Sequence, residues 1–413
     1  MNAARHLCHS AANGVRLVCR AASSSAAASS ASAAAATMTV RRRVSIVSDA
    51  EECCREVDDH LRGCDRVAMD CEGVMLGRFG RLCLVQLSTR ERILVCDALK
   101  TGVVEALKPI LSDPNIIKVC HDCREDSSAL YHQHGVLLRS VFDTQVAYRL
   151  HLQRTRTDQG KGMAEGSSPY DEHGGSDSSA YAFDAPLAVP LKAFLDISTP
   201  PSREMKQRMS DDPTLWFRRP LGADLLRYAM EGVRHLIPLM DAMTRKGSSA
   251  AATGGAGGGG SDAQIDVDSV LSASQRYVDY RVLNSGFDRP ADIATRGTNV
   301  QGVLVSRVPS KLLFKLNCGR QGVVSTLSAI KRFRDVQIGE VADCVVSNVS
   351  VDGNYVYLDR FDALHDYWSL KQRPKSHYRP TRQADEHETA DPLLVPQVDP
   401  TDHDAHMHQD DGR

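Results

Sequence analysis

Val67-Ala-Met-Asp-Cys-Glu-Gly73 is an apolar run that ends in two carboxylates, and a glycine that allows the chain to turn follows them. In a β-strand, residues i and i+2 project from the same face, so Asp70 and Glu72 are expected to lie side by side. Adjacent carboxylates repel each other unless a cation lies between them. Mg²⁺ or Mn²⁺ is the usual cation where phosphodiesters are cut, because hard ions take oxygen ligands. By itself, an Asp-x-Glu pair is more often a solvated strand end.

A second acidic group follows a later strand. Asn115-Ile-Ile-Lys-Val-Cys120 predicts a buried strand, and His121-Asp-Cys-Arg-Glu-Asp126 opens a helix. Ligands of open sheets bind outside the carboxyl ends of strands, so Asp126 is a candidate third carboxylate. The alternative is that Asp126 only complements the helix dipole in the first turn, a role for which Asp122 and Glu125 compete.

Four strings carry a family resemblance: MDCEG at 69–73, KVCHDCRED at 118–126, VFDTQVAYRL at 141–150 and LWFRRPLGADLLRYAMEGVRHLIPL at 215–239. Together they resemble the RNase D branch of the DEDD 3′ to 5′ exonucleases, most closely its Egalitarian-type members. The resemblance spans about Arg43 to Met243. It implies an α/β fold of the RNase H-like type, a mixed sheet flanked by helices.

The resemblance also implies a chemistry for these residues. Asp70, Glu72 and Asp126 would coordinate two Mg²⁺ or Mn²⁺ ions, and the hydroxyl of Tyr228 would orient the attacking water. The reaction would release nucleoside monophosphates from a 3′ end. The other reading of Tyr228 is an interfacial aromatic residue on an amphipathic helix. Asp143 is expected to be structural, as a helix cap.

The sequence departs from the family pattern at one position. The family has an aspartate four residues after the tyrosine, and here that place is taken by Gly232. Glu231 is the obvious substitute, but adjacent helix positions point about 100° apart. Glu231 could replace the carboxylate only through a local register change, which Gly232 would make easier.

Two hypotheses follow from this departure. The first is a metal-dependent 3′ to 5′ exonuclease that acts on RNA, or on another single-stranded nucleic acid, and is weakened by the missing carboxylate. The second is a catalytically inactive, RNA-binding scaffold on a nuclease fold, acting within a ribonucleoprotein complex.

Length and composition indicate several parts and no membrane role. The chain has 413 residues and a net charge of −2, so any basic nucleic-acid surface must be local. No apolar run approaches the roughly 20 residues that span a bilayer. The twelve cysteines are scattered without zinc-finger spacing, which predicts free thiols in a reducing compartment.

The N-terminal segment is rich in Ala, Ser and Arg, and its first acidic residue is Asp49. This composition predicts a transit peptide, mitochondrial rather than plastid, although a disordered tail on a cytoplasmic protein also fits. The division we expect is a transit peptide or tail at 1–42, an exonuclease-like domain at 43–245 with a polar insertion at 153–180, a flexible linker at 246–262, a helical connector at 263–296, a barrel at 297–362 and an acidic, His-bearing tail at 376–413.

Beyond the linker, five short strands separated by Gly and Asp-Gly-Asn turns predict a small all-β barrel of the OB-like type. Such barrels bind single strands through basic groups for phosphate and aromatic rings for bases. The candidate nucleic-acid-binding residues are Lys311, Lys315, Arg320, Lys331, Arg332, Phe333 and Arg334. The alternative is that the aromatic residues fill the core, while the charges only solvate the exterior.

Overall fold

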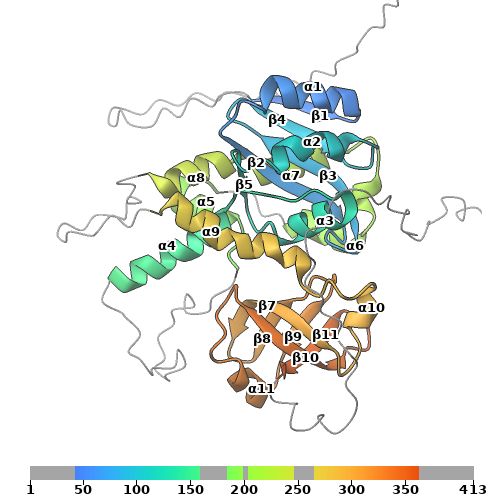
Figure 1. The fold of residues 1–413 in the computed structure, drawn as a ribbon, viewed down its shortest axis with the longest axis vertical. Helices are drawn as coiled ribbons and strands as arrows, with labels where there is room; N and C mark the ends of the chain where they lie inside the picture. Colours follow the sequence, from blue (N-terminus) through green and yellow to red (C-terminus); the bar gives the residue numbers. More distant parts are fainter. Residues whose placement is uncertain (1–41, 159–183, 199–202, 246–264, 362–413) are drawn as a thin grey trace, which may run out of the picture.

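The structure, a computed structural model, describes residues 42–158, 184–198, 203–245 and 265–361 (Figure 1). These residues form an α/β part and a closed β-barrel, which lies below the sheet in the view of Figure 1. The predicted transit peptide, most of the polar insertion, the linker and the acidic tail lie outside the described residues.

The α/β part is built on a mixed sheet of six strands in the order β1-β4-β3-β2-β5-β6. Strand β3 runs antiparallel to β2 and β4, whereas the other neighbouring pairs are parallel. The strand bounds are β1 Arg43–Val47, β2 Arg66–Val74, β3 Arg81–Ser88, β4 Arg92–Asp97, β5 Ile117–Cys120 and β6 Val141–Asp143. The predicted mixed sheet is confirmed.

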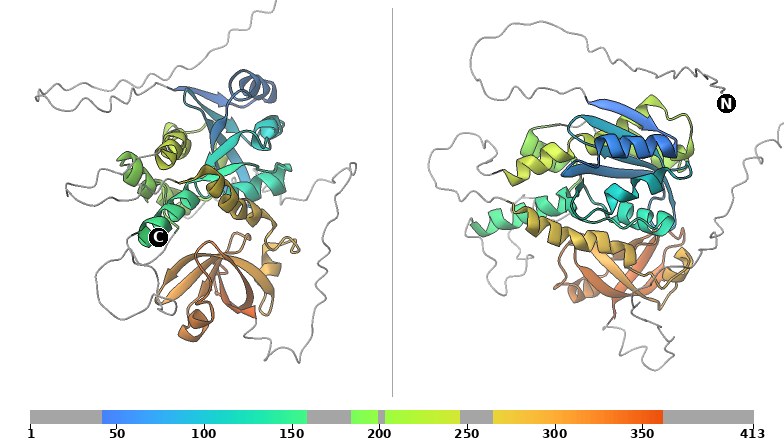
Figure 2. Two further views of the ribbon diagram at one scale, coloured as in Figure 1. Left: turned by 60° about the vertical axis from the view of Figure 1, so that its left-hand side comes forward. Right: turned by 45° about the horizontal axis from the view of Figure 1, so that its top comes forward.

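Helices cover both faces of this sheet (Figures 1 and 2). One core lies beneath α1, α2 and α3, and the other beneath α5, α7 and α8. The bounds are α1 Ala50–His60, α2 Val103–Leu111, α3 Arg124–His134, α4 Thr144–Asp158, α5 Ala188–Leu195, α6 Arg203–Asp211, the short helix η2 Leu215–Phe217, α7 Ala223–Arg234 and α8 Leu236–Thr244. Helix α4 therefore continues past Gln153, where the sequence led us to begin the polar insertion.

The two faces follow from the alternation of side chains along β2. Met69 and Cys71 are buried in the core beneath α1, α2 and α3, whereas Ala68 is buried in the core beneath α7. Because alternate residues share a face, Asp70 and Glu72 project toward the side of the sheet that α7 covers. The sequence of β2 thus places two acids under one particular helix.

The predicted helical connector packs on the α/β part rather than only linking two domains. It contains α9 Val267–Val278, η3 Asp279–Val282 and α10 Pro290–Ile293. In α9, Tyr277 and Val278 are buried in the first core and Val270 in the second. Asp266 caps α9 by accepting a hydrogen bond from the Ser269 backbone N–H at 2.8 Å. The exonuclease-like core therefore includes residues on both sides of the linker.

The C-terminal part is a closed barrel with strand order β10-β11-β9-β8-β7. Strands β9 and β11 pair in parallel, and the other pairs are antiparallel. The bounds are β7 Asn299–Val308, β8 Lys311–Lys315, β9 Gln321–Val324, α11 Leu327–Arg332, β10 Val341–Val349 and β11 Tyr355–Arg360. The barrel is consistent with the predicted OB-like domain. Helix α11 was not predicted.

Within the described ranges, no helix has both the length and the apolar character needed to cross a bilayer.

Candidate active site

Asp70 and Glu72 lie on β2 opposite β3, where Asp70 pairs with Gln86 and Glu72 with Leu84. A bulge follows Glu72, because the register shifts between Glu72 and Gly73. Both acidic side chains are partly exposed. Burial raises the pKa of Asp70 to about 7, and burial together with the charge of Asp70 raises the pKa of Glu72. The two carboxylates therefore lie close enough to oppose each other's ionisation.

Asp126 lies in the first turn of α3, directly after the carboxyl end of β5, and is 5% exposed. Strands β2 and β5 are parallel neighbours, so their carboxyl ends meet at the same edge of the sheet. Burial is the main cause that raises the pKa of Asp126, and the charges of Asp70, Asp122 and Glu72 raise it further. The structure thus places the three carboxylates that the sequence singled out within electrostatic range of one another.

Tyr228 reaches this group from α7. Its ring packs against Trp216, with 6.2 Å between the ring centroids. Burial raises the pKa of the Tyr228 hydroxyl, and the charges of Glu72 and Asp70 raise it further. The phenol therefore stays protonated near the two carboxylates, and it can donate a hydrogen bond there.

Gly232 faces Asp70 directly. A Cβ atom at position 232 would lie 2.2 Å from Oδ2 and 3.2 Å from Cγ of Asp70. The carboxylate of Asp70 therefore fills the space into which a side chain at position 232 would project. The position that holds an aspartate in the resembling family thus has no side chain here, and Asp70 occupies the space that one would need.

Glu231, the possible substitute, is engaged elsewhere. Its Oε1 lies 3.1 Å from Nη1 of Arg234, and its Oε2 lies 3.6 Å from Nε2 of His235. A hydrogen bond from His235 lowers the pKa of Glu231, and the charges of Arg234 and Arg227 lower it further. This basic surrounding, formed by its own helix and the residue after it, speaks against Glu231 as a replacement for the missing carboxylate.

These donors do not fit the two-ion arrangement implied by the resemblance. Across residues 42–158, 184–198, 203–245 and 265–361, no three His, Cys, Asp or Glu side chains are grouped so that they could hold a metal ion. Asp70, Glu72 and Asp126 interact electrostatically without converging as ligands.

Asp143 holds the loop that leads to Asp126. Its fully buried carboxylate accepts hydrogen bonds from the backbone N–H groups of Asp122 at 3.1 Å, Cys123 at 2.9 Å and Gln145 at 2.9 Å. This contact ties the end of β6 to the start of α3, in agreement with the structural role expected for Asp143. It also orients the first turn of α3, on which Asp126 lies.

The barrel reaches the neighbourhood of Asp126 through Lys315. Nζ of Lys315 lies 3.4 Å from Asp122 and 3.5 Å from Glu125, and its charge opposes the rise in the pKa of Asp126. Local sequence pattern carries no signal for this contact, because it joins residues about 190 positions apart.

The other candidate nucleic-acid-binding residues divide into three groups. Lys311, Lys331 and Arg334 are exposed. Arg332 pairs with Asp359, and Nε of Arg332 donates to Oδ1 at 2.8 Å. Phe333 is fully buried and packs on Phe314 with 5.2 Å between ring centroids. The predicted base-stacking role of Phe333 does not fit this burial, because a ring in the barrel core offers no free face.

Residues 43–248 match the family of 3′-5′ exonuclease domains. This part of the chain belongs to that family. The predicted resemblance to RNase D is confirmed, whereas the closer placement among Egalitarian-type members stays a prediction.

The relatives include both RNase D and a second kind of protein. The chain is 30% identical over 297 residues to the piRNA biogenesis protein EXD1 of Xenopus laevis, covering 70% of this chain and 59% of that protein. It is 30% identical over 183 residues to EXD1 of Mus musculus, with 44% of this chain and 29% of the relative covered. Ribonuclease D of Xanthomonas oryzae is 29% identical over 194 residues, which cover 46% of this chain and 44% of that protein.

The chain therefore spans less than two thirds of the length of these relatives. Among solved structures, the crystal structure of Trypanosoma brucei RNase D aligns with a TM-score of 0.44 and 22% identity. That alignment covers 59% of this chain and 75% of the other.

Proposed function

We propose that this chain binds the 3′ end of single-stranded RNA in an exonuclease-type site and hydrolyses the strand slowly or not at all. Its family supports an exonuclease-type site, and its Ribonuclease D relatives support an RNA ligand. One observation carries the proposal. Gly232 lacks the fourth carboxylate, and the side chain of Asp70 fills the space that this carboxylate would need.

The electrostatics of the site agree with binding in the absence of a metal. Three ionised carboxylates would repel a phosphodiester. Burial raises the pKa of Asp70, Glu72 and Asp126, and neighbouring carboxylate charges raise those of Glu72 and Asp126 further, so the site carries less negative charge than its composition suggests. Protonated carboxyl groups and the Tyr228 hydroxyl can donate hydrogen bonds to phosphate or ribose oxygens.

A slow exonuclease is the second candidate. It is favoured by the retention of Asp70, Glu72, Asp126 and Tyr228 within electrostatic range of one another. This candidate needs Mg²⁺ or Mn²⁺, and it needs Asp70 to leave its present position against Gly232. Disturbing a residue that supports a metal typically costs about 10- to 100-fold in activity, and loss of a ligand should cost at least as much.

The test is incubation of the purified full chain with 5′-labelled single-stranded RNA in Mg²⁺ and in Mn²⁺, with binding followed by fluorescence anisotropy. The control is the double variant Asp70→Asn, Glu72→Gln. We expect binding by the wild type, and strand shortening no faster than with the control. Metal-dependent shortening clearly above the control would establish the exonuclease instead, and absence of binding would reject both candidates.

Two further proposals rest on the relatives and on the N-terminal sequence rather than on the site. The EXD1 relatives are named for piRNA biogenesis, so assembly into a ribonucleoprotein complex is a reasonable proposal for this chain too. Mitochondrial targeting is proposed from the N-terminal sequence, which lies outside the described residues. Import of the first 42 residues fused to a fluorescent protein would test it.

A further inference from the structure

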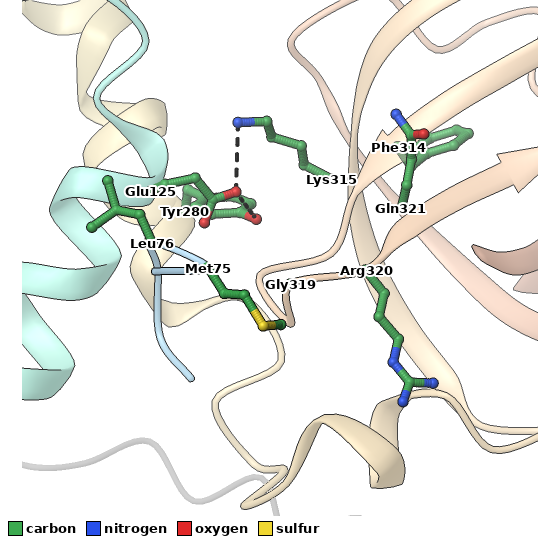
Figure 3. Close-up of a pocket in the computed structure, with 9 residues that line it drawn as sticks. All are labelled: Met75, Leu76, Glu125, Tyr280, Phe314, Lys315, Gly319, Arg320 and Gln321. Carbon is green, nitrogen blue, oxygen red and sulfur yellow. Dashed lines mark hydrogen bonds and ion pairs between the residues drawn. The ribbon is translucent and has the colours of Figure 1, made fainter. Parts of the chain in front are cut away.

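A pocket of about 300 Å³ lies between the barrel and the exonuclease domain (Figure 3). The exonuclease domain contributes Met75, Leu76 and Glu125, and the barrel contributes Lys315, Arg320 and Gln321. This volume is at the lower end of the range for ligand pockets.

The pocket adjoins the candidate active site on two sides. Met75 and Leu76 follow β2 directly, so they lie on the chain that leaves Asp70 and Glu72. Glu125 is the residue before Asp126 in the first turn of α3. A strand whose 3′ end reaches the three carboxylates would therefore pass this pocket or end beside it.

Most charges around the pocket are balanced within the protein. A chain of ion pairs links the two domains through three acids and three bases: Asp122, Glu125 and Asp184 with Arg124, Arg149 and Lys315. The hydroxyl of Tyr280 also donates to Glu125 at 3.0 Å. Lys315 is therefore neutralised by the acids of α3 and the loop before it.

Arg320 is different. It lines the pocket and is partly exposed, and its guanidinium makes no hydrogen bond or ion pair with any residue that the structure describes. Figure 3 shows its guanidinium extending away from the Lys315 and Glu125 pair. Beside it, Met75 is 66% exposed, and its Cε would lie 3.5 Å from a Cβ atom at Gly319. The pocket therefore presents one uncompensated cation next to an exposed apolar side chain.

The basic cluster of Lys331, Arg332 and Arg334 is placed less well for the same task. It lies at α11, and Figures 1 and 2 show this helix at the end of the barrel far from the sheet. Arg332 is also already paired with Asp359. A strand held only at α11 would have to cross the length of the barrel to reach the carboxylates.

We propose that the pocket between the domains holds one nucleotide of a single-stranded RNA, with its phosphate on Arg320 and its base against Met75. This inference rests on the proposed function and names the barrel surface that serves it. An arginine guanidinium matches a phosphate through paired N–H donors. The polarizable thioether of methionine packs favourably on aromatic rings.

The experiment measures anisotropy of a short 5′-labelled single-stranded RNA with the full chain in EDTA, over a series of salt concentrations. The variants are Arg320→Glu and Arg320→Lys in the pocket and Arg334→Glu at the far end of the barrel. Arg296→Glu is the matched control, because Arg296 is an exposed arginine of the region leading into the barrel that does not line the pocket. A thermal melt of each variant verifies folding.

We expect Arg320→Glu to weaken binding roughly tenfold. The slope of log affinity against log salt should fall by about 0.7, the value for one phosphate contact on a single strand. Arg320→Lys should keep the salt slope, because the charge is retained, but should lose part of the affinity, because an ammonium lacks the paired donors. Arg296→Glu should match the wild type.

The two possible failures can be distinguished. If the wild type binds RNA but Arg320→Glu leaves both affinity and slope unchanged, the pocket is overturned while the proposed function stands. Loss of binding in Arg334→Glu alone would move the contact to α11 and would also overturn the pocket. If the wild type does not bind, the proposed function fails, and the pocket fails with it.

Discussion

At the scale of single residues, the decisive contact is that of Asp70 with Gly232. An aspartate at the fourth position would compete with Asp70 for the same volume, because even a Cβ atom there would lie 2.2 Å from Oδ2. Gly232 therefore does more than remove one possible ligand, since it leaves room for the side chain of Asp70 in a partly buried site. In that site burial raises the pKa of Asp70 to about 7.

The pKa of Asp70 predicts a pH dependence of stability. In the folded protein this pKa is about 7, against an ordinary value of 3.8. A raised carboxyl pKa means that the folded state retains a proton that the unfolded state loses. The stabilisation from Asp70 is thus fully present below about pH 4, and it is lost as the pH rises toward about 7.

The variant Asp70→Asn should remove this dependence, because an amide does not titrate in this range. We expect the free energy of unfolding of the variant to fall less steeply between about pH 4 and pH 7, by at most about 1.4 kcal/mol per pH unit. Urea unfolding in EDTA at several pH values measures it, with the exposed Asp268→Asn as the control. Parallel curves for Asp70→Asn and the wild type would show that Asp70 is already ionised.

At the scale of elements, the site depends on strand β2, on helix α3 after the carboxyl end of β5, and on helix α7. Strand β2 supplies Asp70 and Glu72, the start of α3 supplies Asp126, and α7 supplies Tyr228 and the bare backbone of Gly232. Helix α7 is fixed by Leu225, Ala229 and Val233, which are buried against the sheet. These apolar residues hold the polar face of α7 over the carboxylates.

Because Gly232 lies inside helix α7, the effect of a side chain at position 232 can be measured as a change in the free energy of unfolding. Replacing Gly with Ala inside a helix usually stabilises by about 1 kcal/mol. Here we expect Gly232→Ala to give no gain, because its Cβ atom would collide with Asp70. In an Asp70→Ala background the collision is absent, and the same substitution should stabilise by about 1 kcal/mol. Chemical unfolding of the four proteins gives the coupling, and additive effects would contradict the packing described here.

At the scale of the whole molecule, the barrel is fastened to the exonuclease domain by polar contacts around η3. The side-chain amide of Asn317 donates to the backbone carbonyls of Tyr280 at 3.1 Å, Arg281 at 2.9 Å and Leu283 at 3.2 Å. Its oxygen accepts a hydrogen bond from Oγ of Ser128 at 2.6 Å. Asn317 is almost fully buried, so these bonds are not replaced by water when they are lost.

Asn317→Ala should therefore loosen the junction between the two parts. We expect a loss of about 2 to 4 kcal/mol in unfolding free energy, because several buried carbonyls lose their partner. Hydrogen exchange should increase at η3 and at the loop between β8 and β9 before it increases in the sheet. The exposed Asn348→Ala on β10 serves as the control. Equal protection in both variants would mean that Asn317 does not hold the junction.

The sequence predicted the parts of the molecule whose cause is local. The alternation in β2, the strand and helix start around Asp126 and the turn-rich strands of the barrel each follow from short stretches of sequence, so an α/β sheet and a barrel were expected. The mixed strand direction was expected only from the family resemblance. Helix α11 was missed because its six residues are too few to show a helical period.

The parts that could not be predicted depend on contacts between distant segments. The ion pairs of Lys315 with Asp122 and Glu125, the burial of Phe333 and the packing of α9 on the sheet all require the tertiary fold. The sequence identified Gly232 as the departure from the family pattern. Only the structure shows that Asp70 occupies the vacated space and that Glu231 is held by Arg234 and His235.

The most direct test of the account restores the missing carboxylate. Wild type, Gly232→Asp and Gly232→Ala are each incubated with 5′-labelled single-stranded RNA in Mn²⁺ and in EDTA. Both variants displace Asp70 by a side chain at position 232, but only Gly232→Asp adds a fourth acid beside Asp70, Glu72 and Asp126. We predict metal-dependent shortening from the 3′ end by Gly232→Asp alone, at least tenfold faster than by the wild type. Equal, metal-dependent shortening by the wild type would contradict the account.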